Sequence, residues 1–265
     1  MLYWKRSGGF LFFRRPRTGR DRAGRQTVCF PSMYVQGGIP LLVRKNMEFL
    51  QEALPFFKKL DGRELELIAA TGFCSAFPSG KIIMNRDREC NGLVIVRDGQ
   101  LRAFYELEDG KEITLYRLLP RDVCILTASC VLENISFEIT LEVEKDSEIC
   151  FIPALTWKKL AEENVAVKEF SMGLVSERFS EVMWVMEQMV SKNMGQRIAA
   201  FLLEQSVLEN SRTLSLTHDT IARNIGTARE VVSRSLKYLE NDGLLKLSRG
   251  RIELTDLKRL REMCR

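Results

Sequence analysis

The chain has 265 residues and 45% hydrophobic content, which is enough for one large or two modest folded domains. No stretch approaches the roughly 20 apolar residues that a membrane-spanning helix needs, so the sequence predicts no membrane partner. The net charge of +5 hides an uneven distribution: residues 1–46 hold ten basic residues and one acidic residue, and the remainder is slightly acidic.

The first 46 residues lack hydrophobic periodicity, and glycines and prolines interrupt them throughout. This composition predicts a mostly disordered basic extension over residues 1–46. An arginine-rich, acid-poor segment is also typical of an organellar transit peptide or of an arm that binds nucleic acid. We favour a third interpretation, an extension upstream of the true start, because a clean amphipathic helix begins at Met47.

The cysteine and histidine content excludes several classes of enzyme. The seven cysteines include no Cys-x-x-Cys pair, so a zinc ribbon or thioredoxin-like site is unsupported, and we expect free thiols in a reducing cytoplasm. His218 is the only histidine and cannot supply the several imidazoles that metal-dependent hydrolases and oxygenases need. It also excludes Ser–His catalysis elsewhere in the chain. We therefore predict no catalytic residues and no metal site.

Residues 47–163 predict a β-rich domain that begins with two short helices over 47–70. The hydrophobic period then changes to two, in the runs FCSAF, KIIMN, GLVIV, LRAFYEL, EITLYRL, FEITLEV and EICFI. Asp109-Gly110 lies between two of these runs and is a strong hairpin signal. Short strands at this spacing predict an antiparallel β-roll.

Residues 164–193 predict a long helix with an apolar seam. Its apolar residues are spaced three and four apart, as in a coiled coil: Met172, Val175, Phe179, Val182, Met186 and Met189. Trp184 and Val185 add apolar area outside this seam, so the helix needs two partners. We favour a seam between two copies of the chain over a helix packed only on its own domain.

Residues 194–265 have the pattern of a winged helix-turn-helix. A helix capped by Thr217 ends in a tight turn at Gly226, and a second amphipathic helix follows. A two-stranded wing with its turn at Arg249-Gly250 completes the pattern. The whole chain is thus predicted to be α+β: an N-terminal antiparallel β-roll, a long dimerisation helix and a C-terminal winged helix-turn-helix.

The segment LTHDTIARNIGTAREVVSRSLKYLENDGLL resembles, almost position by position, the helix-turn-helix of the Crp/Fnr superfamily of bacterial transcription regulators. The run GLVIVRDGQLRAFYELEDGKEITLYRLLPRD is similar to that family's sensor roll, and the order of elements is similar over about 50–260. The resemblance implies a cyclic-nucleotide-binding-like roll of the double-stranded β-helix type. It also implies a homodimer that binds a palindromic site in double-stranded DNA and contacts RNA polymerase, without enzymatic activity.

The resemblance maps the family's base-reading positions onto one helix face, formed by Arg229, Glu230, Ser233 and Arg234. Arginine pairs bidentately with guanine and glutamate accepts from cytosine, and the implied half-site contains a TGA core. Contacts to phosphates, which position without specifying, are expected from Thr217, Thr227 and Lys237. The alternatives are a capping box between Thr227 and Glu230, and solvated surface charge for the two arginines.

The sensor departs from family members that bind cyclic AMP, which carry Gly-Glu before a short helix and Arg-Ser or Arg-Thr further on. The matching stretch here, RDVCILTASCVLENISFEITLEV, has Ile125-Leu126 and Ser136-Phe137 at those places. No basic residue lies within 123–144, so a phosphate buried there would lack a cationic partner. We predict that the roll binds no cyclic nucleotide.

Cys124 and Cys130 are the remaining candidates for an effector or redox site. The oxygen-sensing branch of the family holds an iron–sulfur cluster through a closely spaced N-terminal cysteine group, whereas Cys29 stands alone in the sequence. The thiols of Cys124 and Cys130 could form a disulfide, ligate haem or another cofactor, or line an apolar pocket. We favour small core hydrophobes, which buried cysteines commonly are.

Together these features predict a cytoplasmic DNA-binding regulator in which an effector or thiol change at the roll alters the spacing of two recognition helices. A sensor that acts through protein contacts rather than DNA is the alternative. A cupin-like oxygenase would share the roll shape, but the predicted strands contain no histidine to bind its metal.

Overall fold

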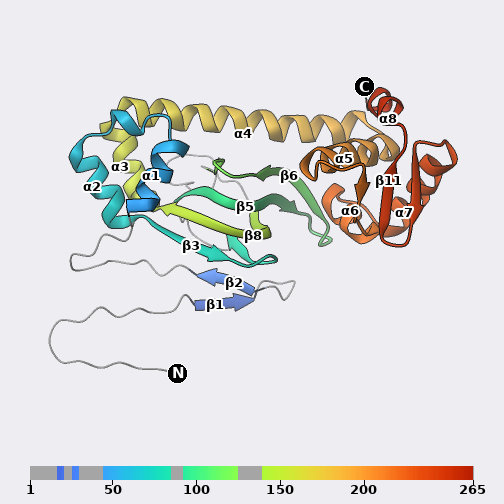
Figure 1. Cartoon of the computed structure of the whole chain (residues 1–265), viewed down its shortest axis with the longest axis horizontal. Helices are drawn as coiled ribbons and strands as arrows, with labels where there is room; N and C mark the ends of the chain where they lie inside the picture. The colour runs from blue at the N-terminus through green and yellow to red at the C-terminus, as the bar shows by residue number, and fades with distance from the viewer. Residues whose placement is uncertain (1–16, 21–25, 30–43, 85–91, 125–138, 265) are drawn as a thin grey trace. The chain divides into compact units, whose positions relative to one another are not determined.

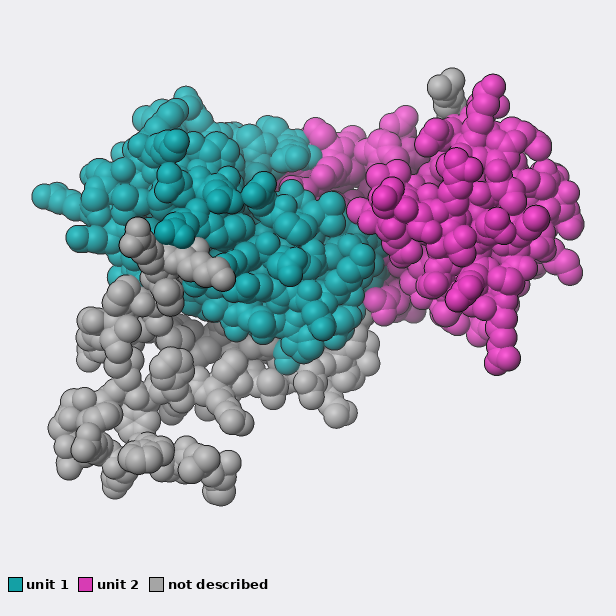
Figure 2. Space-filling model, in the orientation of Figure 1, with its two compact units in different colours: residues 1–103, 117–177 teal, residues 104–116, 178–265 magenta. Residues whose placement is uncertain are grey.

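The computed structural model describes residues 17–20, 26–29, 44–84, 92–124 and 139–264. Within these ranges, antiparallel strands are combined with helices and a helix-turn-helix, which confirms the predicted α+β class (Figure 1). The chain packs as two compact units (Figure 2). Unit 1 contains residues 1–103 and 117–177, and unit 2 contains residues 104–116 and 178–265. No described helix is long and apolar enough to cross a membrane.

Eight strands form one sheet in the order β1-β2-β4-β8-β5-β6, with β3 paired to β8 and β7 paired to β5. Their bounds are β1 Arg17–Arg20, β2 Gln26–Cys29, β3 Phe73–Phe77, β4 Ile82–Met84, β5 Leu93–Glu106, β6 Glu112–Leu118, β7 Val123–Cys124 and β8 Thr140–Ile152. Strands β1 and β2 pair antiparallel within the basic extension. Residues 44–46 begin a helix, and the rest of that extension lies outside the described residues, so its disorder stays a prediction.

Two strands of the sheet are longer than the hydrophobic pattern predicts. The runs GLVIV and LRAFYEL both lie in β5, and the final two runs both end in β8. Gly99 lies within β5 at φ +92°, and a Cβ at this position would collide with Asp146 and Ser147 of β8. The glycine therefore permits a close approach between two strands, where the sequence pattern predicted a break.

The expectation of free thiols is wrong for one pair of cysteines. Cys74 in β3 forms a disulfide with Cys150 in β8. The strand register places the two residues directly opposite each other, with their Cα atoms 4.0 Å apart. They are 76 positions apart in the sequence, so the spacing of cysteines along the chain gives no indication of the pairing. Cys124 and Cys264 form no disulfide.

The helices of unit 1 include a buried tryptophan in α3 that contacts the start of α4. They are α1 (Arg44–Ala53), the 3-10 turn η1 (Phe57–Lys59), α2 (Gly62–Thr71), α3 (Ala154–Glu163) and the first part of α4 (Val165–Ser191). Trp157 is fully buried, its ring meets Phe56 edge-on with centroids 5.7 Å apart, and its Nε1 donates to Ser171 Oγ at 3.1 Å. Asp61 and Glu64 form a capping box that starts α2, which separates two short helices as the sequence predicts over 47–70.

Unit 2 contains the helix-turn-helix and the wing. Its C-terminal elements are α5 (Met194–Leu208), β9 (Thr213–Leu214), α6 (His218–Ile225), α7 (Arg229–Asn241), β10 (Leu245–Ser248), β11 (Arg251–Leu254) and α8 (Leu257–Met263). Strand β9 pairs with β11, so the predicted two-stranded wing belongs to a three-stranded sheet. Strand β9 has only two residues, so hydrophobic periodicity does not predict it.

Candidate nucleic-acid interface

Helix α6 is defined at both ends by local chemistry. Thr217 is the N-cap, and its Oγ1 accepts a hydrogen bond from the Thr220 amide at 3.0 Å. Gly226 ends the helix in the left-handed conformation at φ +67°, and its N–H bonds back to the Ala222 carbonyl. This conformation favours glycine, so the turn between the two helices forms where the sequence predicts it.

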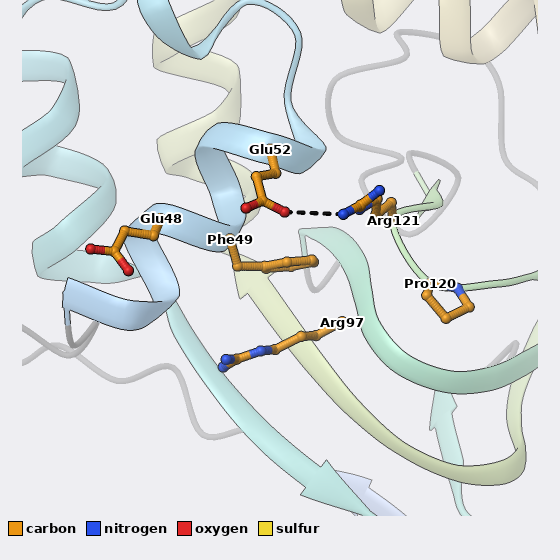
Figure 3. A pocket seen from close by; sticks show the side chains of 6 residues that line it. All are labelled: Glu48, Phe49, Glu52, Arg97, Pro120 and Arg121. Atoms are coloured by element: carbon orange, nitrogen blue, oxygen red, sulfur yellow. Dashed lines mark hydrogen bonds and ion pairs between the residues drawn. The ribbon is translucent and has the colours of Figure 1, made fainter.

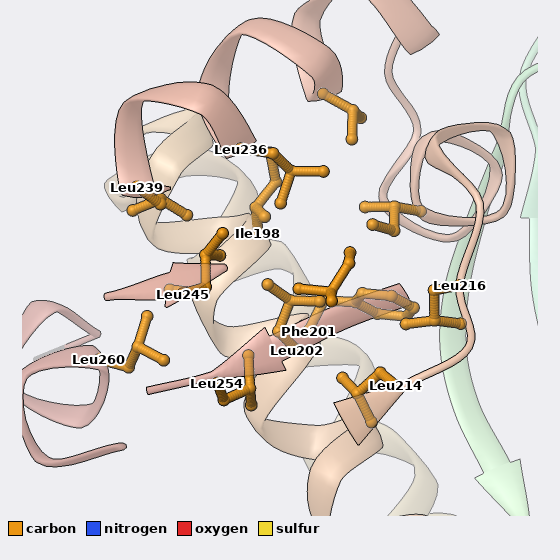
Figure 4. Packing of buried hydrophobic residues seen from close by; sticks show 14 of the residues in the cluster. Ile198, Phe201, Leu202, Leu214, Leu216, Leu236, Leu239, Leu245, Leu254 and Leu260 are labelled. Carbon is orange, nitrogen blue, oxygen red and sulfur yellow. The ribbon is translucent and has the colours of Figure 1, made fainter. Parts of the chain in front are cut away.

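Helix α7 is held by one apolar face. Val232, Leu236 and Leu239 are each at most 1% exposed and join the core of unit 2. Figure 4 shows this core, in which residues of α5 such as Ile198 and Phe201 lie beneath α7 and the wing. With its apolar face fixed by this packing, the opposite face of α7 must point to solvent.

The predicted base-reading residues occupy that opposite face. Arg229, Glu230, Ser233 and Arg234 are all exposed, as is Lys237 one turn further along. The N-cap of α7 is Ala228, which has no side-chain oxygen, and no side-chain capping bond forms. The capping-box alternative for Glu230 is therefore wrong, because the box needs a Ser or Thr at the cap position.

One base-reading candidate has an intramolecular partner. Arg229 Nη1 lies 3.3 Å from Asp219 Oδ2 of α6, and both side chains are more than 60% exposed. An exposed pair of this kind contributes little to stability, so the guanidinium can exchange the carboxylate for a base edge. Sequence reasoning missed Asp219, which lies in the preceding helix and has no motif of its own.

The predicted phosphate-contact residues differ in exposure. Thr217 and Lys237 are exposed, whereas Thr227 is half-buried in the turn. The wing adds exposed cations that the sequence-based prediction omitted: Lys246, Arg249 and Arg251. Their clustering around one hairpin turn was the available signal, because basic residues gathered on one element are typical of surfaces that bind a phosphate backbone.

The predicted seam on α4 is largely uncovered within one chain. Met172 is 58% exposed, Phe179 60%, Met186 51% and Met189 41%. Val175 and Val182 are half-buried. Trp184, outside the seam, is 54% exposed. Exposed apolar side chains repeated along one helix are typical of an interface with another molecule.

The stretch that the sequence predicts as an effector or redox site is only partly described. Cys124 is fully buried in β7, whereas Cys130, Ile125-Leu126 and Ser136-Phe137 lie outside the described residues. A surface pocket of about 500 Å³ is lined by Phe49, Pro120 and four charged residues (Figure 3). Its two arginines already pair with carboxylates, Arg97 with Glu148 at 2.9 Å and Arg121 with Glu52 at 3.1 Å. The pocket therefore has no evident excess of positive charge for an anionic ligand.

Two arginines on β5 and β6 are each bonded to a glutamate of β8. Arg102 is fully buried, and its Nη1 lies 3.2 Å from Glu142 Oε2. Arg117 Nε lies 2.7 Å from Glu144 Oε2. Burial alone would raise the pKa of Glu144, but hydrogen bonds from Arg117 hold it below its ordinary value. These arginines are charge-balanced within the protein. No group of three or more potential metal-binding side chains is found among the described residues.

Comparison with known proteins relates both parts of the chain to described families. Residues 75–164 match the model of the cyclic nucleotide-binding domain, and residues 196–263 match that of the Crp-like helix-turn-helix domain. A crystal structure of a Crp/Fnr-family transcriptional regulator from Eubacterium rectale is 40% identical, with a TM-score of 0.77. That similarity covers 81% of this chain and 99% of the other.

Curated relatives are more distant. The cyclic AMP receptor protein of Thermus thermophilus is 23% identical over 209 residues, which cover 79% of this chain and 96% of that protein. The regulatory protein btr of Bordetella pertussis is 25% identical over 192 residues, covering 69% and 78%. The match to the Thermus regulator SdrP is 32% identical but spans only 95 residues, 34% of this chain and 47% of that protein.

Proposed function

Because the chain belongs to the Crp/Fnr family of transcription regulators, we propose that it binds a palindromic site in double-stranded DNA as a homodimer. The observation that carries this proposal is the exposed face of α7. Four side chains able to bond base edges lie there, on a helix whose opposite face is anchored in the core. The proposal includes no enzymatic activity, and it places the protein in the cytoplasm with its DNA target.

Each half of the site is read by one copy of α7. Arg229 and Arg234 are assigned to guanine, Glu230 to cytosine, and Ser233 to an adjacent base edge. A TGA core in each half-site follows from the family resemblance. Thr217, Thr227 and Lys237 are assigned to phosphates, and the wing cations Lys246, Arg249 and Arg251 join them.

The homodimer forms through the seam on α4. Burying exposed Met172, Phe179, Met186 and Met189 against their copies would remove a large apolar surface from water. Two recognition helices must then match successive major-groove turns, about 34 Å apart. An effector that alters packing at this seam would change that distance, and with it the affinity for DNA. Contact with RNA polymerase, implied by the family, belongs to the same proposal.

The controlling signal is an effector or a redox change rather than a cyclic nucleotide. The chain has no basic residue over 123–144, and two arginines of the sheet with buried side chains, Arg102 and Arg117, are bonded to glutamates. A cyclic phosphate would have to displace one of these carboxylates from a buried arginine, which is costly. Haem ligation or thiol chemistry at Cys124 and Cys130 remains part of the proposal.

We expect millimolar cyclic AMP or cyclic GMP to leave the thermal unfolding midpoint unchanged. A ligand that binds only the native state at 100 times its Kd adds about 2.7 kcal/mol of stability, so binding would be readily visible. Differential scanning fluorimetry over a concentration series measures this shift. AMP serves as the control for non-specific nucleotide effects, and a dose-dependent rise specific to a cyclic nucleotide would contradict the prediction.

Selection from a random duplex library tests the proposed function directly. The full-length protein should enrich an inverted repeat whose half-sites are centred about 10 bp or a multiple of it apart. Because base readout and dimer symmetry are both required for such a pattern, enrichment of it supports both. A pool without shared sequence would instead favour the alternative in which the chain acts through protein contacts.

A further inference from the structure

The tip of the β5–β6 hairpin belongs to the same compact unit as the helix-turn-helix. Residues 104–116 group with residues 178–265 rather than with the remainder of the sheet (Figure 2). The tip is a well-formed turn, in which Leu107 N donates to Lys111 O at 2.7 Å and Gly110 has a φ of +78°. Both strands lead from this tip into unit 1, since β5 begins at Leu93 and β6 ends at Leu118.

Three consecutive hairpin residues contact the last residues of α6. Ile113 pairs with Ile225 in an antiparallel bridge. Thr114 Oγ1 donates to Asn224 Oδ1 at 2.8 Å, across 110 positions of sequence. Each contact therefore joins the hairpin to the residues just before the turn into α7.

An ion pair and a close apolar contact complete the junction. Arg223 Nε lies 3.3 Å from Glu112 Oε2, and the glutamate side chain is only 7% exposed. A Cβ added at Gly226 would lie 2.6 Å from Ile113 Cγ1, so the hairpin packs directly against the turn. We name the contacts of Glu112, Ile113 and Thr114 with residues 223–226 the hairpin junction.

The buried core of the helix-turn-helix contains no residue of the hairpin. The buried cluster beneath α6 and α7 contains only residues between Ile198 and Leu260. The C-terminus of α6 is also held from within the domain, because the Arg197 guanidinium donates to the Ile225 carbonyl. The hairpin junction therefore lies outside this cluster, and it constrains where the helix pair lies relative to the hairpin.

The net negative charge of the hairpin repels the phosphates of DNA. Residues 104–116 carry four acids, Glu106, Glu108, Asp109 and Glu112, against the single base Lys111. While the junction is closed, Glu112 neutralises Arg223, and the other acids lie within a short stretch of the hairpin that contacts the turn. DNA affinity depends strongly on net charge near the phosphates, so a closed junction weakens binding.

We propose that the hairpin junction is an autoinhibitory latch, in which Glu112, Ile113 and Thr114 restrain the helix-turn-helix until a change in the roll moves the hairpin. This inference rests on the proposed DNA-binding function. The latch is opened through β5 and β6, because both strands connect the hairpin tip directly to the sheet. Opening separates Arg223 from Glu112 and withdraws the acidic hairpin.

A double-mutant cycle on the full-length protein tests the latch. Glu112→Gln is measured alone and in the Arg223→Gln background, by fluorescence anisotropy with the selected duplex and a mixed-sequence duplex. We expect Glu112→Gln to raise DNA affinity about two- to fivefold, the range for a partly exposed ion pair, and to have a smaller effect once Arg223 is absent. Thr114→Val, which removes the hydrogen bond at nearly constant volume, should also raise affinity.

Glu108→Gln is the matched control, since it removes the same charge from an exposed position of the same hairpin. Its effect should be smaller than that of Glu112→Gln and equal in both backgrounds. Equal effects of the two substitutions, an unchanged effect without Arg223, or lower affinity on opening the junction would each overturn the latch. If the wild-type protein binds no duplex, both the proposed DNA-binding function and the latch are wrong. If the protein binds the selected duplex but the double-mutant cycle shows no coupling between Glu112 and Arg223, only the latch is wrong.

Discussion

Alanine at both Arg229 and Arg234 is expected to abolish sequence-specific DNA binding. Both guanidinium groups are exposed on the face of α7 that the core leaves free. Each bidentate arginine–guanine pair contributes about 1–3 kcal/mol of discrimination, so losing both should reduce specific affinity at least about thirtyfold. Fluorescence anisotropy with the selected duplex and a scrambled duplex measures this loss.

A second double variant separates base reading from simple loss of charge. Arg212→Ala with Arg261→Ala removes the same charge from exposed positions outside α6 and α7. It should weaken binding to every duplex similarly and keep the preference for the selected one. If the Arg229/Arg234 variant also keeps that preference, these arginines do not read bases. Neither variant touches Val232, Leu236 or Leu239, so the thermal unfolding midpoint should remain near the wild-type value.

Glutamate at Phe179 is expected to convert the proposed homodimer into a monomer. Phe179 is 60% exposed near the middle of the seam on α4. At a two-fold interface a single substitution introduces two carboxylates, and burying unpaired charge is strongly unfavourable. Sedimentation equilibrium should show a single-chain mass, and affinity for the palindromic duplex should fall to that for one half-site.

Trp184→Glu provides the control for the seam. Trp184 is 54% exposed on the same helix, but five residues from Phe179 correspond to about 140° around the helix axis. The same charge change there should leave the mass of the assembly unchanged. Dissociation by Trp184→Glu together with a stable dimer in Phe179→Glu would place the interface on the other face of α4.

The helix-turn-helix could be predicted from the sequence because its signals are local. The Thr217 cap, the glycine turn at Gly226 and the spacing of Val232, Leu236 and Leu239 all act within a few residues of one another. The same local periodicity identifies which side of α7 is buried, and so which side carries Arg229. Asp109-Gly110 identified the sensor hairpin for the same reason.

Features that depend on distant residues could not be predicted. Cys74 meets Cys150 only because β3 pairs with β8 in one register. The hydrophobic pattern predicts two separate runs, GLVIV and LRAFYEL, because the nearby backbone of β8 that Gly99 accommodates is not visible in a local pattern. The same limit applies to Thr114 and Asn224, which are 110 positions apart in sequence.

The absence of a residue type can be read from a sequence, whereas the proximity of two distant side chains cannot. The absence of a basic residue over 123–144 is a property of composition and bears directly on phosphate binding. Whether Cys124 and Cys130 come together is a property of arrangement, and Cys130 lies beyond the described residues.

Unit 2 is formed by two separate segments of the chain, so a single truncation cannot isolate it. A fragment cut at the boundary that the sequence suggests, residues 194–265, retains the buried cluster from Ile198 to Leu260. It also lacks residues 104–116, which pack in the same unit. Such a fragment contains the helix-turn-helix without the hairpin that packs against it. A DNA affinity measured with the fragment would therefore not be that of the intact chain.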